Sequence, residues 1–243
     1  MHRFYSGSEN VSQDRIIISD RQQLHHLKDV LRLEAGDEAE VFDDKGNVYQ
    51  VEVESLSYRN VVLKIKDIRK SDKSKRILIA IGCAIPKKSK MDDIIDKLTQ
   101  LGVDKIIPLI TERVIVKLDK DKKSQRQKRW QKIALSASKQ SQRNTVPVVE
   151  VVMDFEEIIK RAQDFDLKLI PNLRGERRTL KEALIGKKPK SVLVLIGPEG
   201  DFSPEEISMA IKAGFIPVTF GDFVFRVETA CLYIASVLNY ELG

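Results

Sequence analysis

The sequence is poor in the residues that build disulfide frameworks and metal centres. Its 243 residues include two cysteines, three histidines and one tryptophan. Cys83 and Cys231 are too few for a disulfide framework or a thiolate zinc site, and they suit a reducing compartment. The histidines lack the i, i+4 spacing of a helical metal pair; they are His2, His25 and His26. We therefore expect no metal centre.

Long apolar stretches are missing as well. No stretch approaches the ~20 apolar residues that a membrane-spanning helix needs. Residues 1–7 contain no apolar run of the kind that a signal peptide carries. The sequence therefore predicts a cytoplasmic protein that has no membrane partner.

Several motifs of nucleotide binding and hydrolysis are absent. The sequence contains no G-x-G-x-x-G, no P-loop and no G-x-S-x-G. These absences argue against a conventional dinucleotide or nucleoside triphosphate fold, and against a hydrolase with a serine nucleophile.

Positive charge is concentrated in one window. The whole chain carries a formal net charge of +6. Residues 117–132 contain eight Lys or Arg and two Asp, so this window alone also carries +6. Clustered cations attract polyanions and release counterions from nucleic acid. A solvated helix face preceded by a flexible loop would account for the charge cluster equally well, so charge alone leaves both interpretations open.

Residues 1–70 are rich in short strands. Alternating or branched runs predict strands at 16–18, 39–42, 48–53 and 61–65. The polar segment 43–47 has the composition of a hairpin turn. One helix interrupts the strands, with Asp20 as its cap, apolar residues at helical spacing to Leu31, and Gly36 as its stop. A small barrel would close such short strands without exposed edges.

The pattern changes after a polar, charged linker at 70–76. Expected strands lie at 77–82, 105–110, 148–152, 167–171, 192–197 and 215–220. Expected helices lie at 88–101, 124–142, 155–163, 180–185, 204–213 and 228–240. Capping boxes begin three of these helices, at Asp154, Thr179 and Ser203, and Gly102 and Gly214 suit left-handed C-caps. This alternation indicates an α/β domain over residues 71–243 with a largely parallel sheet.

Two glycine-containing turns follow expected strands near the C-terminus, at 197–202 and 221–226. Turns at the carboxyl ends of parallel strands are where α/β sheets place ligands, and glycine lets the backbone approach a ligand closely. Phe223 and Phe225 could wall an apolar pocket for an adenine ring, although core packing is the more common role. Arg226 suits either an ion pair with Glu228 or the stabilisation of a phosphate or a developing oxyanion.

Segments along nearly the whole chain resemble, in order, those of one family. Arg3–Tyr5 and His26–Arg32 resemble its opening and its H-L-x-x-V-L-R segment. Further matches are Lys97–Val103 with K-x-x-E-L-G-V, Thr111–Arg113 with S-E-R, Trp130–Pro147 with W-x-x-I…A-x-E-Q-S-x-R…V-P, Ile196–Ser203 with I-G-P-E-G-G-F-S, and Gly221–Ala230 with L-G-x-R-I-L-R-T-E-T-A. The chain thus resembles the RsmE-type family of SPOUT methyltransferases, the 16S rRNA (uracil-N3)-methyltransferases.

The resemblance implies a fold and an activity. The implied fold is α/β, with a PUA-like β-barrel over 1–70 and a SPOUT domain over 71–243 that ends in a trefoil knot. The implied activity is S-adenosylmethionine-dependent methylation of N3 of a uridine in 16S rRNA. The implied partners are 16S rRNA or the 30S subunit and a second copy of the chain.

The resemblance also implies site residues. Those implied to bind the cofactor are Leu173, Ile196, Gly197, Glu199, Gly200, Phe220, Gly221, Val224 and Phe225. Those implied to bind RNA are Arg3, His26, Arg32, Arg113, Lys122, Lys123, Arg126, Arg129 and Arg143. Arg226 is the first choice for stabilising charge on the uracil oxygens. Glu228 is a candidate base, although its position also suits a salt bridge or a cap.

The chain departs from the family pattern at Gln100, Lys139, Asp201, Phe225 and Val227. Asp201 replaces the second glycine of G-P-E-G-G, so it must take ordinary backbone angles or strain the loop. Two alternatives therefore stay open. One is a SPOUT ribose 2′-O-methyltransferase acting on tRNA or rRNA. The other is a non-catalytic RNA-binding or ribosome-assembly factor that has lost cofactor affinity.

Overall fold

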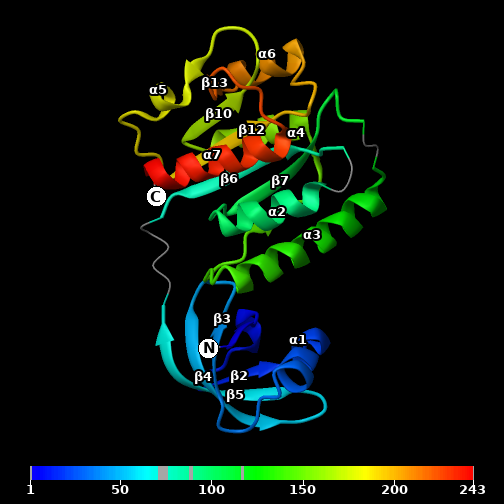
Figure 1. Ribbon diagram of the computed structural model, residues 1–243, viewed down its shortest axis with the longest axis vertical. Coiled ribbons are helices and arrows are strands. Elements are labelled where there is room, and N and C mark those ends of the chain that lie inside the picture. The colour runs from blue at the N-terminus through cyan, green and yellow to red at the C-terminus, as the bar shows by residue number, and fades with distance from the viewer. Residues whose placement is uncertain (1, 71–75, 88–89, 116–117, 243) are drawn as a thin grey trace. The chain divides into compact units, whose positions relative to one another are not determined.

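The computed structural model describes residues 2–70, 76–87, 90–115 and 118–242 (Figure 1). Most of the expected linker, the start of the expected helix at 88–101, and Lys117 lie outside the described residues. The chain divides into two compact units. The N-terminal unit comprises Met1–Ser74 and Ser138–Val146, and the C-terminal unit comprises Lys75–Ala137 and Pro147–Gly243.

The N-terminal unit is built on a five-stranded sheet in the order β1-β3-β4-β5-β2. Its strands are β1 (His2–Tyr5), β2 (Arg15–Ile18), β3 (Glu38–Phe42), β4 (Val48–Leu56) and β5 (Val61–Arg69). The predicted hairpin is confirmed, because Phe42 pairs with Val48 in antiparallel β3 and β4. The sequence did not predict β1, which pairs in parallel with β3.

A short helical segment covers the core of this unit. A 3-10 turn, η1 (Ser8–Asn10), comes first, and α1 (Arg21–His25) then leads into a π-helical turn, η2 (His26–Val30). The Asp20 carboxylate caps α1 by accepting a hydrogen bond from the Gln23 amide. The predicted helix is therefore present as two short helical pieces. Leu27 of η2 packs in the core of this unit with Phe4, Ile16 and Leu63, and all four are fully or almost fully buried.

The C-terminal unit contains an eight-stranded sheet with the order β11-β13-β10-β12-β6-β7-β8, in which β9 also pairs with β7. Every strand pair in it is parallel. The strands are β6 (Leu78–Ala84), β7 (Lys105–Ile110), β8 (Val148–Val149), β9 (Met153–Asp154), β10 (Leu167–Pro171), β11 (Arg178–Thr179), β12 (Ser191–Ile196) and β13 (Ile216–Thr219). The predicted alternation of strands and helices is confirmed, and β9 and β11 are additions to it.

The helices of this unit are α2 (Lys90–Gln100), α3 (Lys120–Gln140), α4 (Phe155–Arg161) with its 3-10 extension η4 (Ala162–Asp164), α5 (Leu180–Leu184), α6 (Pro204–Lys212) and α7 (Val227–Leu242). The end of α3, from Ser138 onward, belongs to the N-terminal unit. All three predicted capping boxes are present. Gly102 and Gly214 have φ angles of 84° and 86°, as predicted for left-handed C-caps. Among the described helices, none is long and apolar enough to cross a membrane.

Helices cover both faces of this sheet (Figure 1). On one face, Leu193 and Leu195 of β12 pack in a core cluster with Phe155 of α4 and Ala210 of α6. On the other face, α7 packs against β6, and the free thiols of Cys231 and Cys83 lie 3.4 Å apart. A sheet buried on both faces explains why the central strands are almost continuously apolar.

Candidate functional site

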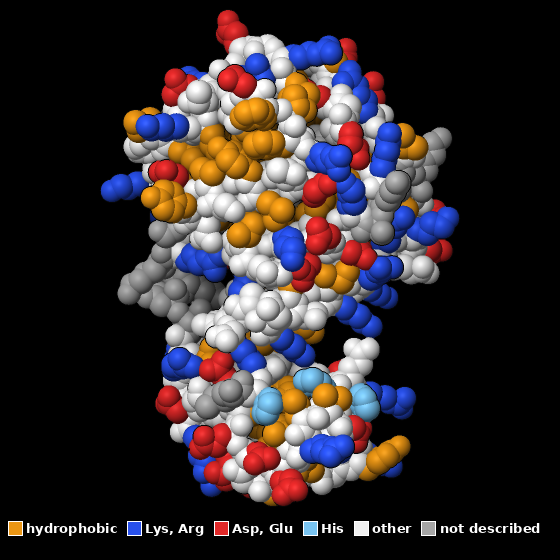
Figure 2. Space-filling view, in the orientation of Figure 1, with side chains coloured by type: hydrophobic (Ala, Val, Ile, Leu, Met, Phe, Trp, Pro, Cys, Tyr) orange, Lys and Arg blue, Asp and Glu red, His pale blue; other side chains and the backbone are white. Residues whose placement is uncertain are grey.

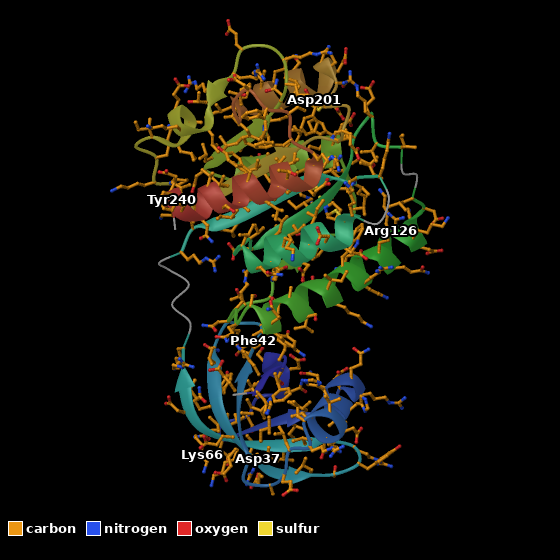
Figure 3. The ribbon with its side chains drawn as sticks, in the orientation of Figure 1. Asp37, Phe42, Lys66, Arg126, Asp201 and Tyr240 are labelled. Atoms are coloured by element: carbon orange, nitrogen blue, oxygen red, sulfur yellow. The ribbon has the colours of Figure 1, made fainter. Side chains whose placement is uncertain are left out.

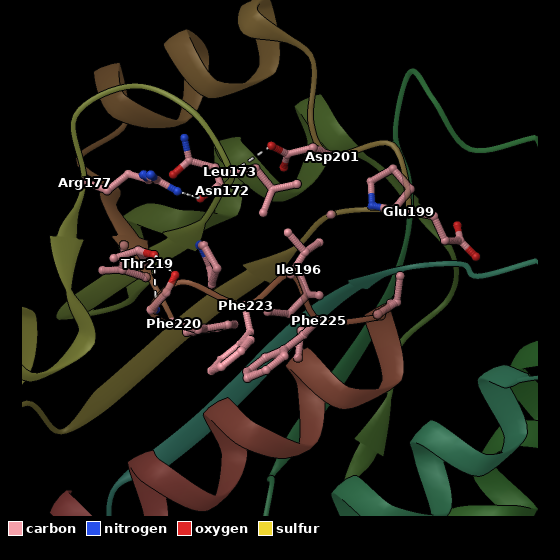
Figure 4. A pocket seen from close by; sticks show the side chains of 18 of the residues that line it. Asn172, Leu173, Arg177, Ile196, Glu199, Asp201, Thr219, Phe220, Phe223 and Phe225 are labelled. Carbon is pink, nitrogen blue, oxygen red and sulfur yellow. Dashed lines mark hydrogen bonds between the residues drawn. The ribbon is translucent and has the colours of Figure 1, made fainter.

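A cavity of about 360 Å³ opens at the carboxyl ends of β10, β12 and β13. Three loops form it, one after each strand, together with the first turn of α7 (Figure 4). This is the edge of a parallel sheet at which ligands bind in α/β proteins. Most of the sequence-predicted cofactor residues line it, namely Leu173, Ile196, Gly197, Glu199, Phe220, Gly221, Val224 and Phe225. Of the predicted set, Gly200 is not part of the lining.

The loop after β12 is fixed by contacts from several directions. A Cβ on Gly197 would lie 3.1 Å from the ring of Phe202, so glycine allows the loop to fold over that ring. The guanidinium of Arg113 donates to the carbonyl oxygens of Gly200, at 2.5 Å, and Phe202, at 3.3 Å. The resemblance implied that Arg113 binds RNA, whereas its described contacts are with this loop.

Asp201 has a left-handed backbone, with φ at 63°. Its carboxylate accepts two backbone hydrogen bonds of 2.9 Å, from Phe202 and from Leu173 of the loop after β10 (Figure 4). Of the two outcomes expected for Asp201, the structure therefore shows the strained backbone, accompanied by side-chain contacts.

The loop after β13 turns at Gly221, whose φ of 106° favours glycine. The Thr219 hydroxyl accepts a hydrogen bond from the Gly221 amide and donates one to its carbonyl oxygen. Beyond the turn, Phe223 and Val224 are 78% and 72% exposed. Phe225 is half-buried, stacks 5.9 Å from Phe220 and meets Tyr233 of α7 edge-on. Phe223 and Phe225 both line the cavity, and their exposure shows that neither is a residue of the buried core.

Several polar residues of the cavity were missed in the sequence. Asn172 follows β10, and its buried side-chain oxygen has no hydrogen-bond partner among the described residues. The side-chain amide nitrogen of Asn172 donates to the backbone carbonyl oxygen of Arg174. The guanidinium of Arg177 donates to the backbone carbonyl oxygen of Asn172. Asp222 completes the polar lining. For Asn172 and Arg177 the one available signal was their position after an expected strand, because that segment carries no glycine before Gly175, whereas Asp222 directly follows the glycine of the predicted turn at 221–226.

Arg226 and Glu228 flank the cavity, but neither is in the described lining. The side chain of Arg226 is exposed. The carboxylate of Glu228 accepts a hydrogen bond from the ammonium of Lys90, the first residue of α2. This hydrogen bond lowers the pKa of Glu228. Sequence reasoning paired Glu228 with Arg226 and missed Lys90, since 138 positions separate the two residues in the chain.

The predicted RNA-binding residues of α3 form a charged face, and three of them pair with carboxylates from outside this helix. Lys122 pairs with Asp119, Lys123 lies 3.5 Å from Asp154, and Arg129 pairs with Asp92. Arg126 projects from α3 with its guanidinium 6.0 Å from the centre of the Trp130 ring (Figure 3). The face is cationic, but part of its charge is already neutralised locally.

In the N-terminal unit, the predicted residues differ in their exposure. Arg3 is largely buried over the Phe42 ring, pairs with Glu40 and donates to Asn144. Burial lowers the pKa of Arg3. Three others remain partly or fully open to a ligand: His26 and Arg32 are exposed, and Arg143 is half-buried.

Lys139 stands where the family pattern has a glutamate, so the charge at this position is reversed. Its side chain is partly buried and is not a surface cation. Its ammonium donates a 3.3 Å hydrogen bond to the side-chain oxygen of Gln23. Burial lowers the pKa of Lys139. Among the described residues, no group of three or more His, Cys, Asp or Glu could hold a metal ion.

Comparisons with known proteins place these features in context. The family described as RNA methyltransferase domain matches residues 72–239, and the RNA methyltransferase PUA domain matches residues 18–66. Ribosomal RNA small subunit methyltransferase E of Bacillus subtilis is 31% identical, over 90% of this chain and 88% of that protein. The protein of the same name from Synechocystis is 32% identical, over 96% and 80%.

Solved structures agree over the whole chain. Ribosomal RNA small subunit methyltransferase E from Neisseria gonorrhoeae, bound to S-adenosyl methionine, has a TM-score of 0.85 at 30% identity and covers 100% of this chain and 98% of its own. A methyltransferase from Legionella pneumophila in complex with the bound cofactor SAM has the same TM-score and identity, and covers 98% and 96%.

Proposed function

This chain belongs to the RNA methyltransferase family, and from that premise we propose that it methylates N3 of a uridine in 16S ribosomal RNA. It is an S-adenosylmethionine-dependent ribosomal RNA methyltransferase, as its relatives are named and as its cofactor-bound neighbours indicate. The choice of uracil N3 rests on the motif resemblance. The observation that supports the proposal most is the three-loop cavity, made by eight of the nine residues expected to bind the cofactor.

The residues of the cavity fit S-adenosylmethionine. Ile196, Phe225 and Val227 supply apolar surface of the kind that an adenine ring needs. The buried oxygen of Asn172 is an acceptor that still needs a donor, and a ligand hydroxyl or amine would satisfy it. Glu199 and Asp222 add carboxylates to the same lining, which suits a ligand with cationic groups.

The bound cofactor would supply an electrophilic methyl group on a sulfonium. Uracil N3 loses its proton as it attacks, so negative charge spreads over the uracil oxygens. A preorganised cation beside those oxygens lowers the barrier. We assign this role to Arg226, which stays protonated and lies between the third cavity loop and α7.

Glu228 has a different role in this proposal. Its lowered pKa makes it a weaker proton acceptor, because the hydrogen bond from Lys90 stabilises the charged form. We propose that Glu228 holds Lys90 and fixes the start of α7, and that the N3 proton leaves by another group.

We propose that RNA binds through cations in each unit whose side chains are at least partly exposed. These are Lys122, Lys123, Arg126 and Arg129 in the C-terminal unit, and His26, Arg32 and Arg143 in the N-terminal unit. Arg3 and Arg113 instead support the local fold of their own units through the contacts described above. The expected substrate is 16S rRNA or the 30S subunit, in the cytoplasm.

We also propose that the chain is a homodimer. Hydrophobic side chains gather over α7 (Figure 2), where Tyr240 is 87% exposed, and Phe223 and Val224 lie in the loop before this helix. A monomer rarely exposes so many large apolar groups together. Light scattering during size-exclusion chromatography would report a mass of about twice 27.7 kDa, and a monomer mass would contradict the proposal.

The finer features of the fold remain part of the proposal. The order β1-β3-β4-β5-β2 and the short strands of the N-terminal unit are compatible with a PUA-like barrel. In the C-terminal unit, β13 lies between β10 and β11, two strands formed earlier in the chain. Such an insertion is compatible with a trefoil knot.

The deciding experiment is mass spectrometry of 16S rRNA from a strain in which the gene is deleted. Loss of one base-methylated uridine, restored by the wild-type gene, is the expected result. A missing ribose methyl group would indicate 2′-O chemistry instead. Unchanged rRNA, together with no S-adenosylmethionine binding by calorimetry, would indicate a non-catalytic RNA-binding protein.

A further inference from the structure

Asp201 links two loops of the cavity that are far apart in the sequence. It belongs to the loop after β12, which ends where α6 begins, while Leu173 belongs to the loop after β10. One oxygen of the Asp201 carboxylate accepts from the Leu173 amide, and the other accepts from the Phe202 amide, both at 2.9 Å. Asp201 and Leu173 both line the cavity, on facing sides of the link drawn in Figure 4.

The backbone of Asp201 makes this arrangement informative. Its φ of 63° lies in the left-handed region, which glycine adopts without strain and other residues adopt rarely. Glycine would therefore be the residue of choice if backbone conformation were the only requirement. A carboxylate at this position adds what glycine lacks, two charge-assisted acceptors for backbone amides.

The rest of the loop is held from its other side. The Asp201 amide donates to the Pro198 carbonyl oxygen at 2.9 Å, which closes the turn. Arg113 binds the carbonyl oxygens on either side of Asp201, those of Gly200 and Phe202. The loop after β12 is thus fixed to the end of β7 through Arg113, and to the loop after β10 through Asp201.

We propose that Asp201 is a positioning residue that clamps the Leu173 loop against the Gly197–Phe202 loop and so preorganises the cavity for S-adenosylmethionine. The inference rests on the proposed function of the cavity. Loops held in the bound conformation before the ligand arrives do not have to be ordered on binding, which raises affinity. The clamp also occupies the Leu173 amide, so this donor is unavailable to the ligand.

Two substitutions separate the clamp from the backbone requirement. Asp201→Gly relieves the left-handed strain and removes both acceptors. Asp201→Asn tolerates the same backbone and keeps one acceptor oxygen, because its amide nitrogen cannot accept. Gln142→Gly is the matched control, since Gln142 has a φ of 57° and lies outside the cavity.

Calorimetry with S-adenosylmethionine and S-adenosylhomocysteine tests the proposal. We expect Asp201→Gly to weaken both ligands by the same factor, about 10- to 100-fold, as befits lost hydrogen bonds to a charged group. Asp201→Asn should weaken both by less, and Gln142→Gly should leave both affinities unchanged. In the free protein, the Leu173 amide should exchange its hydrogen faster in Asp201→Gly than in the wild type. The melting temperature of the variant should stay close to that of the wild type, which shows that the faster exchange is local.

Opposite results would overturn the inference. Wild-type affinity in Asp201→Gly, with unchanged exchange at Leu173, would reject the clamp while leaving the proposed function intact. A loss confined to S-adenosylmethionine would instead indicate a direct contact of the carboxylate with the sulfonium. Failure of the wild type to bind either ligand would reject the proposed function and the clamp together.

Discussion

The ammonium of Lys90, at the start of α2, donates a hydrogen bond to the carboxylate of Glu228 in the first turn of α7. The two helices pack against each other, so the contact ties the end of the third cavity loop to the start of α2. The Lys90 and Glu228 side chains are 40% and 22% exposed, and solvent therefore screens part of their attraction. The hydrogen bond lowers the pKa of Glu228 below its usual value of 4.5.

This pair predicts a pH-dependent contribution to stability. A carboxyl with a lowered folded-state pKa stabilises the fold fully above its unfolded pKa, and the contribution is lost as pH falls through the folded value. We expect Glu228→Gln to lower the free energy of unfolding by about 0.5–1 kcal/mol at pH 7. Denaturant titrations from pH 7 to pH 3 should show the difference from wild type shrinking in acid.

The exposed Glu241 at the far end of α7 provides the control for that experiment. Glu241→Gln should leave stability near that of the wild type throughout the range. A difference for Glu228→Gln that stays constant down to pH 3 would show that the ion pair does not stabilise the fold.

Arg226 is predicted to act in the transition state. Its removal should lower single-turnover methylation of 30S subunits or 16S rRNA by about 10²–10³-fold, while substrate binding changes little. Arg226→Lys keeps the charge but not the planar fork, so its loss should be smaller. Because Glu228 is paired with Lys90, Glu228→Ala should not reproduce the catalytic defect. Full activity in Arg226→Ala, or a loss matched by unfolding in thermal melts, would contradict the assignment.

Gly197 and Gly221 are predicted to be essential for cofactor binding for different reasons. A Cβ on Gly197 would press on the Phe202 ring at 3.1 Å, whereas the space around Gly221 is open and its φ of 106° would strain the backbone of any residue with a side chain. Valine at either position should abolish S-adenosylmethionine binding in calorimetry while the far-UV circular dichroism spectrum stays native. Gly186→Val is the control, because Gly186 also has a positive φ, of 68°, but lies outside the cavity. Unchanged affinity in both cavity variants would remove these turns from the site.

RNA affinity is predicted to depend on the cationic face of α3. Neutralising Lys122, Lys123, Arg126 and Arg129 together should reduce the log–log salt slope of RNA binding by up to ~3–4, at ~0.7–0.9 per phosphate contact. Three of these cations already pair with carboxylates, so a reduction of ~3–4 in the salt slope is an upper limit. S-adenosylmethionine binding should not change.

A matched control neutralises four lysines elsewhere in the C-terminal unit, namely Lys181, Lys187, Lys188 and Lys190, which are all exposed. This variant should alter the slope much less. An equal change of slope in both variants would show that the α3 face contributes to RNA binding only through net charge. An unchanged slope in the α3 variant would show that this face is solvated and does not contact RNA.

The sequence by itself determined the features that depend on neighbouring residues. The capping box of Ser203 and Glu206 and the positive φ of Gly102 are set within a few positions, so they were predictable. Strand and helix order followed from hydrophobic periodicity for the same reason. The cavity at Gly197 and Gly221 could be predicted because carboxyl ends of parallel strands meet at one edge of the sheet.

Tertiary structure alone decided which distant groups meet. β1 is a strand because β3 offers it a partner, and the four residues His2–Tyr5 carry too little pattern to show this. Lys90 reaches Glu228, Arg113 reaches Gly200, and Asp201 reaches Leu173 across 138, 87 and 28 positions. A side-chain hydrogen bond leaves no periodic trace in the sequence, since its partner is fixed only when sheet order and loop conformation bring the two groups within about 3 Å.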